Sequence, residues 1–345
     1  MSDQKVHFGS GGQPYEIKLN RPKALNSLDL DMIDAISTKL DEWESKPTAD
    51  LIMLSGNGEK GFCAGGDVKA VRVALMENGV KGATAFFDRE YALYQRIANS
   101  KIPVVSLQHG IVMGGGIGLS GHAQLRLVRE GARFAMPEKS IGFFTDVAVN
   151  HLVKAAPLHQ RVAFLLTGDM ISPADAIALN LSDQLIGEEE WENLAAYIEQ
   201  CADMPDALDC IKQRAAEIGQ PSPHAPFIEW ADKHQRIFEE KDLGTLLAHL
   251  GEATDEWAQK LYADLLAGSP TSIVASFLLV HRSQTIDSLA AQFALESELA
   301  RVIVGAPDFA EGVRAVLVDK DNQPKWQPSS IGEVPTEQFG FLLSN

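Results

Sequence analysis

Long hydrophobic runs and positive charge are both scarce in this sequence of 345 residues. No uncharged stretch reaches the roughly 20 residues that a membrane-spanning helix needs, and no apolar signal core follows the first residues. The net charge of −17 argues against nonspecific binding to nucleic acid or to anionic membranes. We therefore expect neither a nucleic-acid partner nor a membrane partner.

Cysteine is limited to Cys63, Cys201 and Cys210. Three scattered cysteines are too few for a disulfide framework and do not have the spacing of a zinc site. The sequence therefore favours a reducing compartment, and we predict a cytoplasmic location.

Apolar patterns predict an α/β protein whose second half is mainly helical. Alternating or β-branched runs predict strands at residues 15–20, 51–56 and 102–107. Helical spacing begins at Leu30, with Ser27 or Asp29 as its N-cap. Further helices are predicted at residues 83–100, 158–167, 173–179, 188–201, 252–266, 271–282 and 286–304. We expect a catalytic core over residues 1–190 and a helical C-terminal region over residues 191–345 that packs on it.

A strand, a glycine-rich loop and a helix occur in this order twice. The loops are GFCAGGD, near residue 60, and HGIVMGGGIGLSG, near residue 112. Backbone without Cβ can crowd a ligand, and unpaired N–H groups at a helix start favour an anionic atom. One N–H from each loop would form a two-donor oxyanion hole for a thioester carbonyl. Two acids, Glu138 and Asp146, follow in the apolar segment AMPEKSIGFFTDV.

The glycine pattern also has a competing interpretation. Gly116, Gly118 and Gly121 satisfy the dinucleotide-binding pattern G-x-G-x-x-G, with Glu138 about 20 residues further on. However, Glu138 follows Pro137 instead of ending a second strand, and the other glycine loop would have no role. We therefore regard the dinucleotide site as the weaker hypothesis.

Each acid has a structural interpretation as well. Glu138 would suit the first turn of a helix, and Asp146 would suit the N-cap of the next one. Glu90 lies in an amphipathic helical pattern, where an acid is usually solvated. Cys63 is expected to be a small packed side chain rather than a nucleophile.

Four separated motifs carry a family resemblance. KGFCAGGDVKAV and HGIVMGGGIGLSGH resemble the enoyl-CoA hydratase/isomerase, or crotonase, superfamily. FAMPEKSIGFFTDV and DFAEGVRAVLVDKDNQPKW resemble its 3-hydroxyisobutyryl-CoA hydrolase branch more narrowly. The resemblance implies a spiral of ββα repeats with a mainly helical C-terminal region. It also implies an acyl-CoA substrate, no metal, and no cofactor apart from the coenzyme A of the substrate.

Site residues follow from the resemblance position by position. It assigns the oxyanion-hole N–H groups to Gly66 and Gly115, the catalytic carboxylate to Glu138 and the second acid to Asp146. Glu90 matches a further acid that contacts the substrate. Contacts with the phosphates of coenzyme A are expected from the cations that flank the two loops, namely Arg21, Lys23, Lys69 and Arg72. Ala64 is a further expected contact of coenzyme A.

The implied reaction is hydrolysis of a short 3-hydroxyacyl-CoA thioester, as in valine catabolism, by covalent attack or by a general base. The resemblance implies that hydratases have an acid at the position that Gly118 occupies here. Hydration is therefore disfavoured, because one of its two proton-transfer groups is missing. The run Thr145-Asp146-Val147-Ala148 departs from the family's Pro-Asp-Val-Gly, and the added Cβ atoms are expected to change the backbone beside the second acid.

Acyl specificity therefore stays open. A hydratase or isomerase with altered acids, and a non-catalytic binding or assembly protein of the same fold, remain alternatives. The resemblance also implies a homo-oligomer, unless the longer helical half covers the associating surface.

Overall fold

The computed structural model describes residues 4–9, 14–202, 204, 206–221 and 224–343. The chain forms two compact units that are interleaved along the sequence. The first comprises Met1–Gly66, Arg89–Ala135 and Met170–Pro226, and the second comprises Asp67–Asp88, Met136–Asp169 and Phe227–Asn345. The predicted division into a core of residues 1–190 and a C-terminal region of residues 191–345 stays a prediction.

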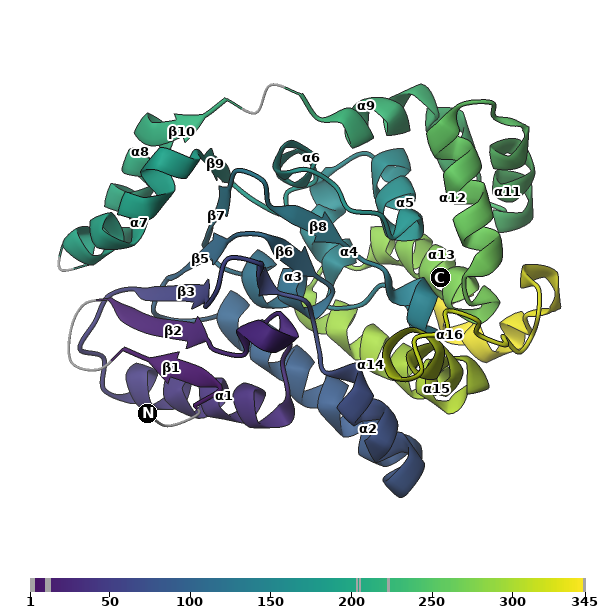
Figure 1. Cartoon of the computed structure of the whole chain (residues 1–345), viewed down its shortest axis with the longest axis horizontal. Helices are drawn as coiled ribbons and strands as arrows, with labels where there is room; N and C mark the ends of the chain where they lie inside the picture. Colours follow the sequence, from purple (N-terminus) through teal and green to yellow (C-terminus); the bar gives the residue numbers. More distant parts are fainter. Residues whose placement is uncertain (1–3, 10–13, 203, 205, 222–223, 344–345) are drawn as a thin grey trace. The chain divides into compact units, whose positions relative to one another are not determined.

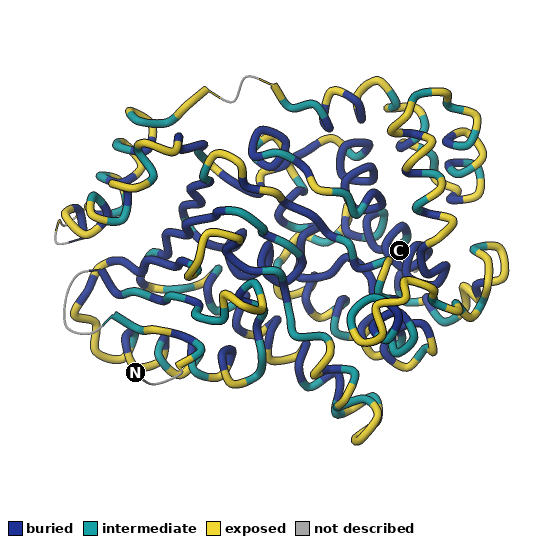
Figure 2. The backbone as a smooth tube through the Cα atoms, viewed as in Figure 1, coloured by how far each residue is buried: buried dark blue, intermediate teal, exposed yellow. Residues whose placement is uncertain are grey.

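A seven-stranded sheet forms the centre of the first unit, in the order β1-β2-β3-β5-β7-β9-β10 (Figure 1). Its strands from β2 to β9 run parallel, while β1 and β10 pair antiparallel at the two edges. The inner strands are buried, as expected for apolar runs in a parallel sheet (Figure 2). The strands are β1 (Val6–Phe8), β2 (Tyr15–Leu19), β3 (Ile52–Gly56), β5 (Val104–Gln108), β7 (Leu125–Arg129), β9 (Gln184–Ile186) and β10 (Gly219–Gln220).

A second, three-stranded parallel sheet consists of β4 (Gly61–Cys63), β6 (Ile111–Met113) and β8 (Arg133–Ala135). Its order β4-β6-β8 repeats the order β3-β5-β7 of the large sheet. Along the chain, each of β3, β5 and β7 is followed by a strand of the small sheet and then by a helical segment. Those segments are α2 (Val68–Ala98), α3 (Gly115–Gly121) and the 3₁₀ helix η2 (Glu138–Ile141). The predicted spiral of ββα repeats is therefore confirmed.

The three predicted strands are confirmed as β2, β3 and β5, with ends shifted by one or two residues. β4 and β6 lie inside the segments that we expected to be glycine loops. Three residues are too short to show an alternating pattern, so the sequence did not reveal them. β9 and β10 were also missed, for the same reason.

Helices α1 (Leu30–Ser45), α6 (Pro173–Ala178), α7 (Glu188–Cys201) and α8 (Ala207–Ile218) belong to the first unit. Asp29 caps α1 by accepting a hydrogen bond from the N–H of Met32 at 3.0 Å, so the second of the two predicted N-caps is confirmed. Helices α7 and α8 bury Ile198 and Ile211 against the large sheet.

The expectation for the cysteines needs correction. Cys201 in α7 and Cys210 in α8 form a disulfide, with Cα atoms 6.2 Å apart. Helices α7 and α8 contact each other, and this contact brings the two cysteines together although they are nine positions apart. The sequence alone does not show this contact. Cys63 is a free, buried cysteine.

The described residues of the second unit form helices joined by loops, and none of them lies in a named strand. Helix α13 (Pro270–Arg282) is buried along most of its length and packs against α5 (Leu158–Thr167) and α14 (Leu289–Gly305). The predicted helices 158–167, 271–282 and 286–304 correspond to these three. The remaining helices that begin beyond residue 140 and lie in this part of the chain are α4 (Val149–Leu152), α9 (Pro226–Lys233), α10 (Gln235–Phe238), α11 (Leu243–Glu252), α12 (Glu256–Ala267), α15 (Pro307–Val313) and α16 (Gly340–Leu343).

Across the part of the chain that the structure describes, no single helix is long and apolar enough to cross a membrane. The helices Glu256–Ala267 and Pro270–Thr285 have the length and composition of a membrane span only when taken together, and they meet at a bend of 117°.

Glycine is required where α3 meets β4. A Cβ atom on Gly116 would lie 2.2 Å from the carbonyl oxygen of Cys63, well inside van der Waals contact with backbone that cannot rotate away. We expect Gly116→Ala to lower the free energy of unfolding by about 1–3 kcal/mol or more, because overpacking forces the backbone apart. Urea unfolding measures the change. Gly332→Ala is the control, since a Cβ there meets nothing within 4 Å; equal stability of the two variants would contradict the prediction.

Candidate active site

The two glycine-rich loops lie at the same edge of the small sheet. β4 and β6 are parallel neighbours, with Cys63 opposite Val112. The loop that begins at Ala64 leaves the carboxyl end of β4, and Gly114 leaves the carboxyl end of β6. Parallel strands end on the same side of a sheet, so both loops emerge together.

Gly66 and Gly115 come into close contact. A Cβ atom built on Gly115 would lie 3.2 Å from the amide nitrogen of Gly66. From the other side, a Cβ on Gly65 would lie 3.2 Å from the amide nitrogen of Gly115. Gly65 has φ +99° and Gly114 has φ +50°, values that favour glycine. The structure therefore brings together the two residues predicted to donate the oxyanion-hole amides, while that role stays a prediction.

A segment of the N-terminal region braces the first loop. The N–H of Leu28 donates to the oxygen of Gly65 at 2.8 Å, and the N–H of Ala64 donates to the oxygen of Leu25 at 2.9 Å. Ala64, a predicted coenzyme A contact, is thus held in a fixed backbone position. These bonds satisfy polar groups of a loop that would otherwise be buried without partners.

Glu90 reaches the second loop from α2. It is 2 % exposed, so the interpretation as a solvated helical acid is wrong. The hydroxyl of Tyr94 lies 2.6 Å from Oε1 of Glu90 and 2.8 Å from the carbonyl oxygen of Gly115. Tyr94 was not predicted as a site residue. Tyr94 lies four residues after Glu90, so both side chains are on one face of the helix. This spacing is the sequence signal that could have identified Tyr94 as a neighbour of Glu90.

Cys63 lies beside the first loop but has no reactive thiol. Burial raises its pKa to about 12, so the nucleophilic thiolate is scarce at neutral pH. Its Sγ donates to the carbonyl oxygen of Asn26 at 3.3 Å. This agrees with the prediction that Cys63 is a packed side chain.

Glu138 opens η2 in the second unit, directly after Pro137. It is 7 % exposed, and its carbonyl oxygen accepts hydrogen bonds from the N–H groups of Gly142 and Phe143. The side chain therefore belongs to a tight, fixed turn. Its position in the first turn also fits the structural interpretation, and the two interpretations are compatible.

Asp146 is 4 % exposed and begins an unusual turn. Val147 and Ala148 have φ +56° and +52°, in the left-handed region that costs residues with a Cβ about 1–2 kcal/mol each. Ala148 stands where the resemblance puts a glycine and keeps a left-handed backbone although it has a Cβ; the expected change of this turn relative to the family stays a prediction. Ala148, not Asp146, is the N-cap residue of α4, so the N-cap interpretation of Asp146 is wrong.

Glu296 on α14 is a further buried acid, which was not predicted as a site residue. It is fully buried, and its Oε2 accepts a hydrogen bond of 2.8 Å from the N–H of Ala148. Gln292 donates to its Oε1, also at 2.8 Å. Burial, and then the charge of Asp146, raise the pKa of Glu296 well above its ordinary value, and the two hydrogen bonds offset only part of the rise. The exposed Glu298 lies two positions away, so no sequence signal separates the buried acid from a surface acid.

Lys139 follows Glu138 and is drawn inward. Its Nζ donates to the carbonyl oxygen of Thr167. Burial lowers its pKa to about 8, although the charges of Asp264 and Asp169 favour the protonated form. A lysine in this state is close to losing its proton under ordinary assay conditions.

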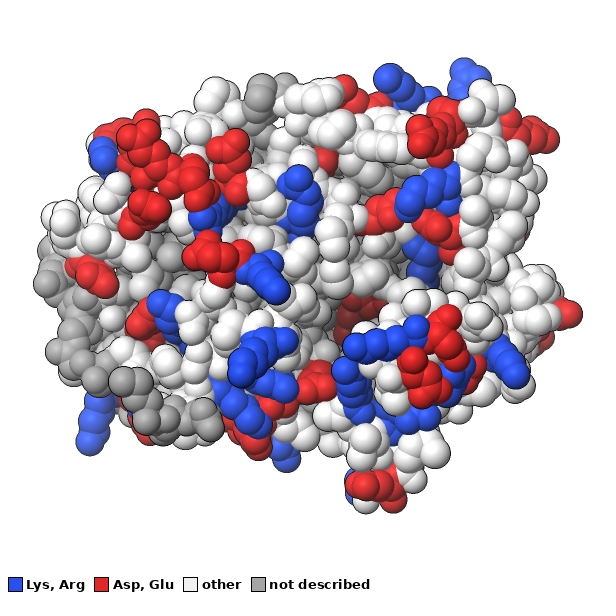
Figure 3. Space-filling model, viewed as in Figure 1, with Lys and Arg blue, Asp and Glu red and all other residues white. Residues whose placement is uncertain are grey.

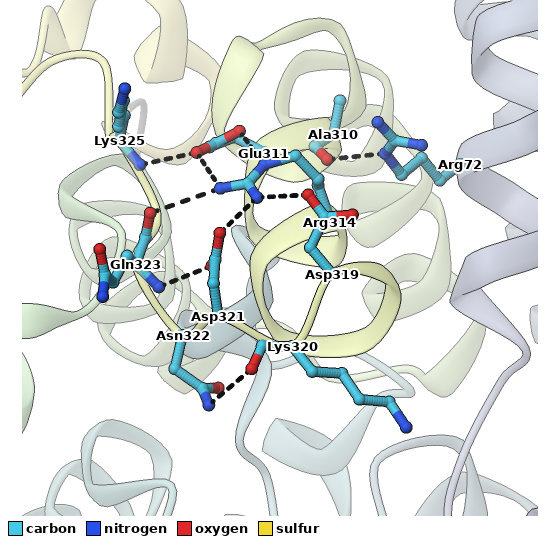
Figure 4. A network of polar contacts seen from close by, with 10 residues as sticks. All are labelled: Arg72, Ala310, Glu311, Arg314, Asp319, Lys320, Asp321, Asn322, Gln323 and Lys325. Atoms are coloured by element: carbon cyan, nitrogen blue, oxygen red, sulfur yellow. Dashed lines mark hydrogen bonds and ion pairs between the residues drawn. The ribbon is translucent and has the colours of Figure 1, made fainter.

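The predicted phosphate contacts lie in both units. Arg21 donates to the carbonyl oxygen of Ser27 at 2.7 Å and pairs with Asp29 at 3.4 Å, while Lys23 is exposed. In the second unit Lys69 is exposed, and Nε of Arg72 donates to the carbonyl oxygen of Ala310 at 2.9 Å (Figure 4).

Basic and acidic side chains are interspersed on the face shown in Figure 3. Cation clusters alone therefore do not identify a phosphate site. No group of three or more His, Cys, Asp or Glu side chains in the described ranges is arranged to hold a metal ion.

Sequence comparison identifies relatives over nearly the whole chain. Residues 15–342 match the family model described as enoyl-CoA hydratase/isomerase. A mitochondrial 3-hydroxyisobutyryl-CoA hydrolase from Danio rerio is 33 % identical over 342 residues, which cover 97 % of this chain and 88 % of that protein. The protein of the same name from Homo sapiens is 32 % identical over 340 residues, covering 94 % and 84 %.

Two solved structures have the same fold. A carnitinyl-CoA dehydratase from Mycobacterium thermoresistibile aligns with a TM-score of 0.90 and 29 % identity, covering 99 % of this chain and 97 % of the other. An enoyl-CoA hydratase from Rhodobacter sphaeroides aligns with a TM-score of 0.89 and 30 % identity, with the same coverage.

The titration of Lys139 predicts a pH-dependent stability. Its pKa is about 8 in the folded protein against 10.5 for an ordinary lysine, so between these values the unfolded chain binds more protons than the folded chain. The free energy of unfolding should therefore rise with pH over this window, relative to a Lys139→Met variant that cannot titrate there. Urea unfolding of both proteins at about pH 7.5, 8.5 and 9.5 measures this. Parallel pH curves for the two proteins would show that Lys139 titrates normally.

Proposed function

This chain belongs to the enoyl-CoA hydratase/isomerase family, and from that premise we propose that it hydrolyses 3-hydroxyisobutyryl-CoA, or a closely similar short 3-hydroxyacyl-CoA, to the free acid and coenzyme A. The observation that carries the proposal is the close approach of Gly66 to Gly115, which presents two backbone amides from separate loops. The relatives named as hydrolases at about one-third identity select hydrolysis among the reactions of the family.

In the proposed reaction, the amides of Gly66 and Gly115 donate to the thioester oxygen and stabilise the charge that develops on it. Glu138 acts on the carbonyl carbon, either by direct attack or by taking a proton from water. Asp146 orients the substrate hydroxyl or that water. Glu90 completes the polar surroundings of the second loop, together with Tyr94, which holds the carbonyl of Gly115.

Hydration of a double bond is the second candidate, because one solved structure of similar fold is titled an enoyl-CoA hydratase. α3 reads Gly-Gly-Ile-Gly-Leu-Ser-Gly and contains no acid, and Gly118 is buried within it. Hydration by a pair of acids would lack one of its two proton-transfer groups there. Hydrolysis needs a single carboxylate at the carbonyl, which Glu138 supplies.

The proposal extends to partners and context. The substrate is the acyl-CoA, with Arg21, Lys23, Ala64, Lys69 and Arg72 as proposed contacts of the coenzyme A part, and no separate cofactor is proposed. The acyl group places the reaction in valine breakdown. A cytoplasmic location and a homo-oligomer also stay proposals; the relatives named above are mitochondrial, and fractionation of the native cells tests the compartment.

Release of free coenzyme A tests the function. We expect the protein to release thiol from 3-hydroxyisobutyryl-CoA faster than from straight-chain or unsaturated acyl-CoA thioesters, and to leave the absorbance of an enoyl-CoA unchanged. Glu138→Gln should lower kcat by about 10²–10⁴-fold, because the amide neither attacks nor takes a proton. Glu252→Gln, at an exposed position of α11, is the matched control.

Three outcomes would contradict this function. Thiol release by Glu138→Gln at the rate of the unmodified protein would remove Glu138 from the mechanism. A change in enoyl absorbance without thiol release would identify a hydratase. No reaction in either assay would favour a binding protein.

The paired amides make a separate prediction. A Cβ on Gly115 would lie 2.6 Å from Oε1 of Glu90 and 3.2 Å from the nitrogen of Gly66, so Gly115→Ala must displace the loop. Loss of one oxyanion donor costs about 10²–10³-fold in kcat, and we expect a loss of that size. Steady-state thiol release measures it, and circular dichroism confirms the fold. Gly332→Ala should keep full activity; full activity in Gly115→Ala would show that the amide pair has no catalytic part.

A further inference from the structure

Glu296 is a fully buried acid of the second unit that the proposed reaction does not use. It lies on α14 among apolar residues, and its exposed fraction is 0 %. A carboxyl group that is removed from water needs partners for its oxygens. Both oxygens have one: Oε1 accepts from Gln292, and Oε2 accepts from the N–H of Ala148.

The second of these bonds reaches the turn that carries Asp146. Val147 and Ala148 both adopt left-handed backbone, which residues with a Cβ seldom keep without outside support. Two side chains hold this turn from outside: Oγ of Ser276 on α13 accepts from the N–H of Thr145, and Glu296 accepts from the N–H of Ala148. Asp146 lies between the two held amides.

We propose that Glu296 is a positioning residue for Asp146: by accepting the Ala148 N–H, it keeps the left-handed turn closed and so fixes the direction of the Asp146 side chain. The inference rests on the proposed function for its catalytic consequence, but its structural part does not depend on any substrate. A glycine at position 148 would adopt this backbone by itself. This chain has Ala148 there, and Glu296 holds its left-handed backbone in place.

The chemistry of Glu296 agrees with this role. Burial, and then the neighbouring charge of Asp146, raise the pKa of Glu296, which favours its neutral form. A neutral carboxyl group still accepts the Ala148 N–H through an oxygen, and it adds no negative charge beside Asp146. A glutamine offers the same acceptor in the same volume, whereas a leucine has no acceptor.

Kinetics of three variants test the proposal. We expect Glu296→Leu to lower kcat by about ten- to a hundredfold with a smaller change in KM, since misplacing a reacting group by about 1 Å has effects of this size. Glu296→Gln should restore kcat to within about threefold of the unmodified protein, because the acceptor is kept. Glu298→Leu, on the exposed side of the same helix, should leave both constants unchanged.

Hydrogen exchange supplies a readout that needs no activity. Peptides that cover residues 143–152 should exchange faster in Glu296→Leu than in Glu296→Gln or in the unmodified protein, because the Ala148 amide loses its acceptor. If the unmodified protein releases no coenzyme A, the proposed function fails, and this measurement still decides the positioning role.

Two results would overturn the inference. Normal kcat and normal exchange in Glu296→Leu, with only a lower melting temperature, would show a purely structural residue. Equal losses in Glu296→Leu and Glu296→Gln would show that the acid proton, not the acceptor, is needed. Should Glu296→Leu fail to fold, Gln292→Leu replaces it: this variant frees Oε1 and should lower kcat and protection in the same direction. Unchanged values there would count against the proposal.

Discussion

The parallel pairing of β4 and β6 is the constraint on which the rest of the candidate site depends. It places Cys63 opposite Val112, so the two loops that follow leave the sheet side by side. Their contact is then tight enough that Gly115 and Gly116 have no room for a Cβ atom. We propose that these two segments supply the oxyanion-hole amides, because donors held on rigid backbone need no reorganisation when charge develops on a bound oxygen.

The acids are organised by a different kind of constraint. Glu138, Asp146 and Glu296 are all nearly or fully buried, and each lies on a segment whose backbone is fixed by hydrogen bonds or capping contacts. The short η2 turn fixes Glu138, while α13 and α14 hold the turn after Asp146. Helical packing therefore positions the acids, and sheet register positions the amides.

Much of this arrangement could be predicted from the sequence, because repeated patterns report repeated structure. The doubled strand–glycine–helix pattern predicted that one residue of each loop serves a common site, and the family resemblance assigned Gly66 and Gly115. Long apolar runs indicated β3 and β5. β4 and β6 could not be found, since three residues show no period. The left-handed backbone of Ala148 is held by Glu296, more than a hundred positions away along the chain, and local patterns do not contain such a contact.

Asp146 and Glu296 form a close pair of acids, and burial favours the neutral form of Glu296. Asp146 and Glu296 interact electrostatically, and two neighbouring carboxylates out of water are not both ionised at ordinary pH. Glu296 is completely enclosed, and the effect of this burial outweighs the two hydrogen bonds that it accepts, which by themselves favour the charged form; its pKa is therefore raised. A single charge beside a neutral acceptor is easier to bury than two charges, because the desolvation of each ion is costly. The Ala148 N–H thus satisfies one oxygen of a buried acid and steadies the turn after Asp146 through a single contact.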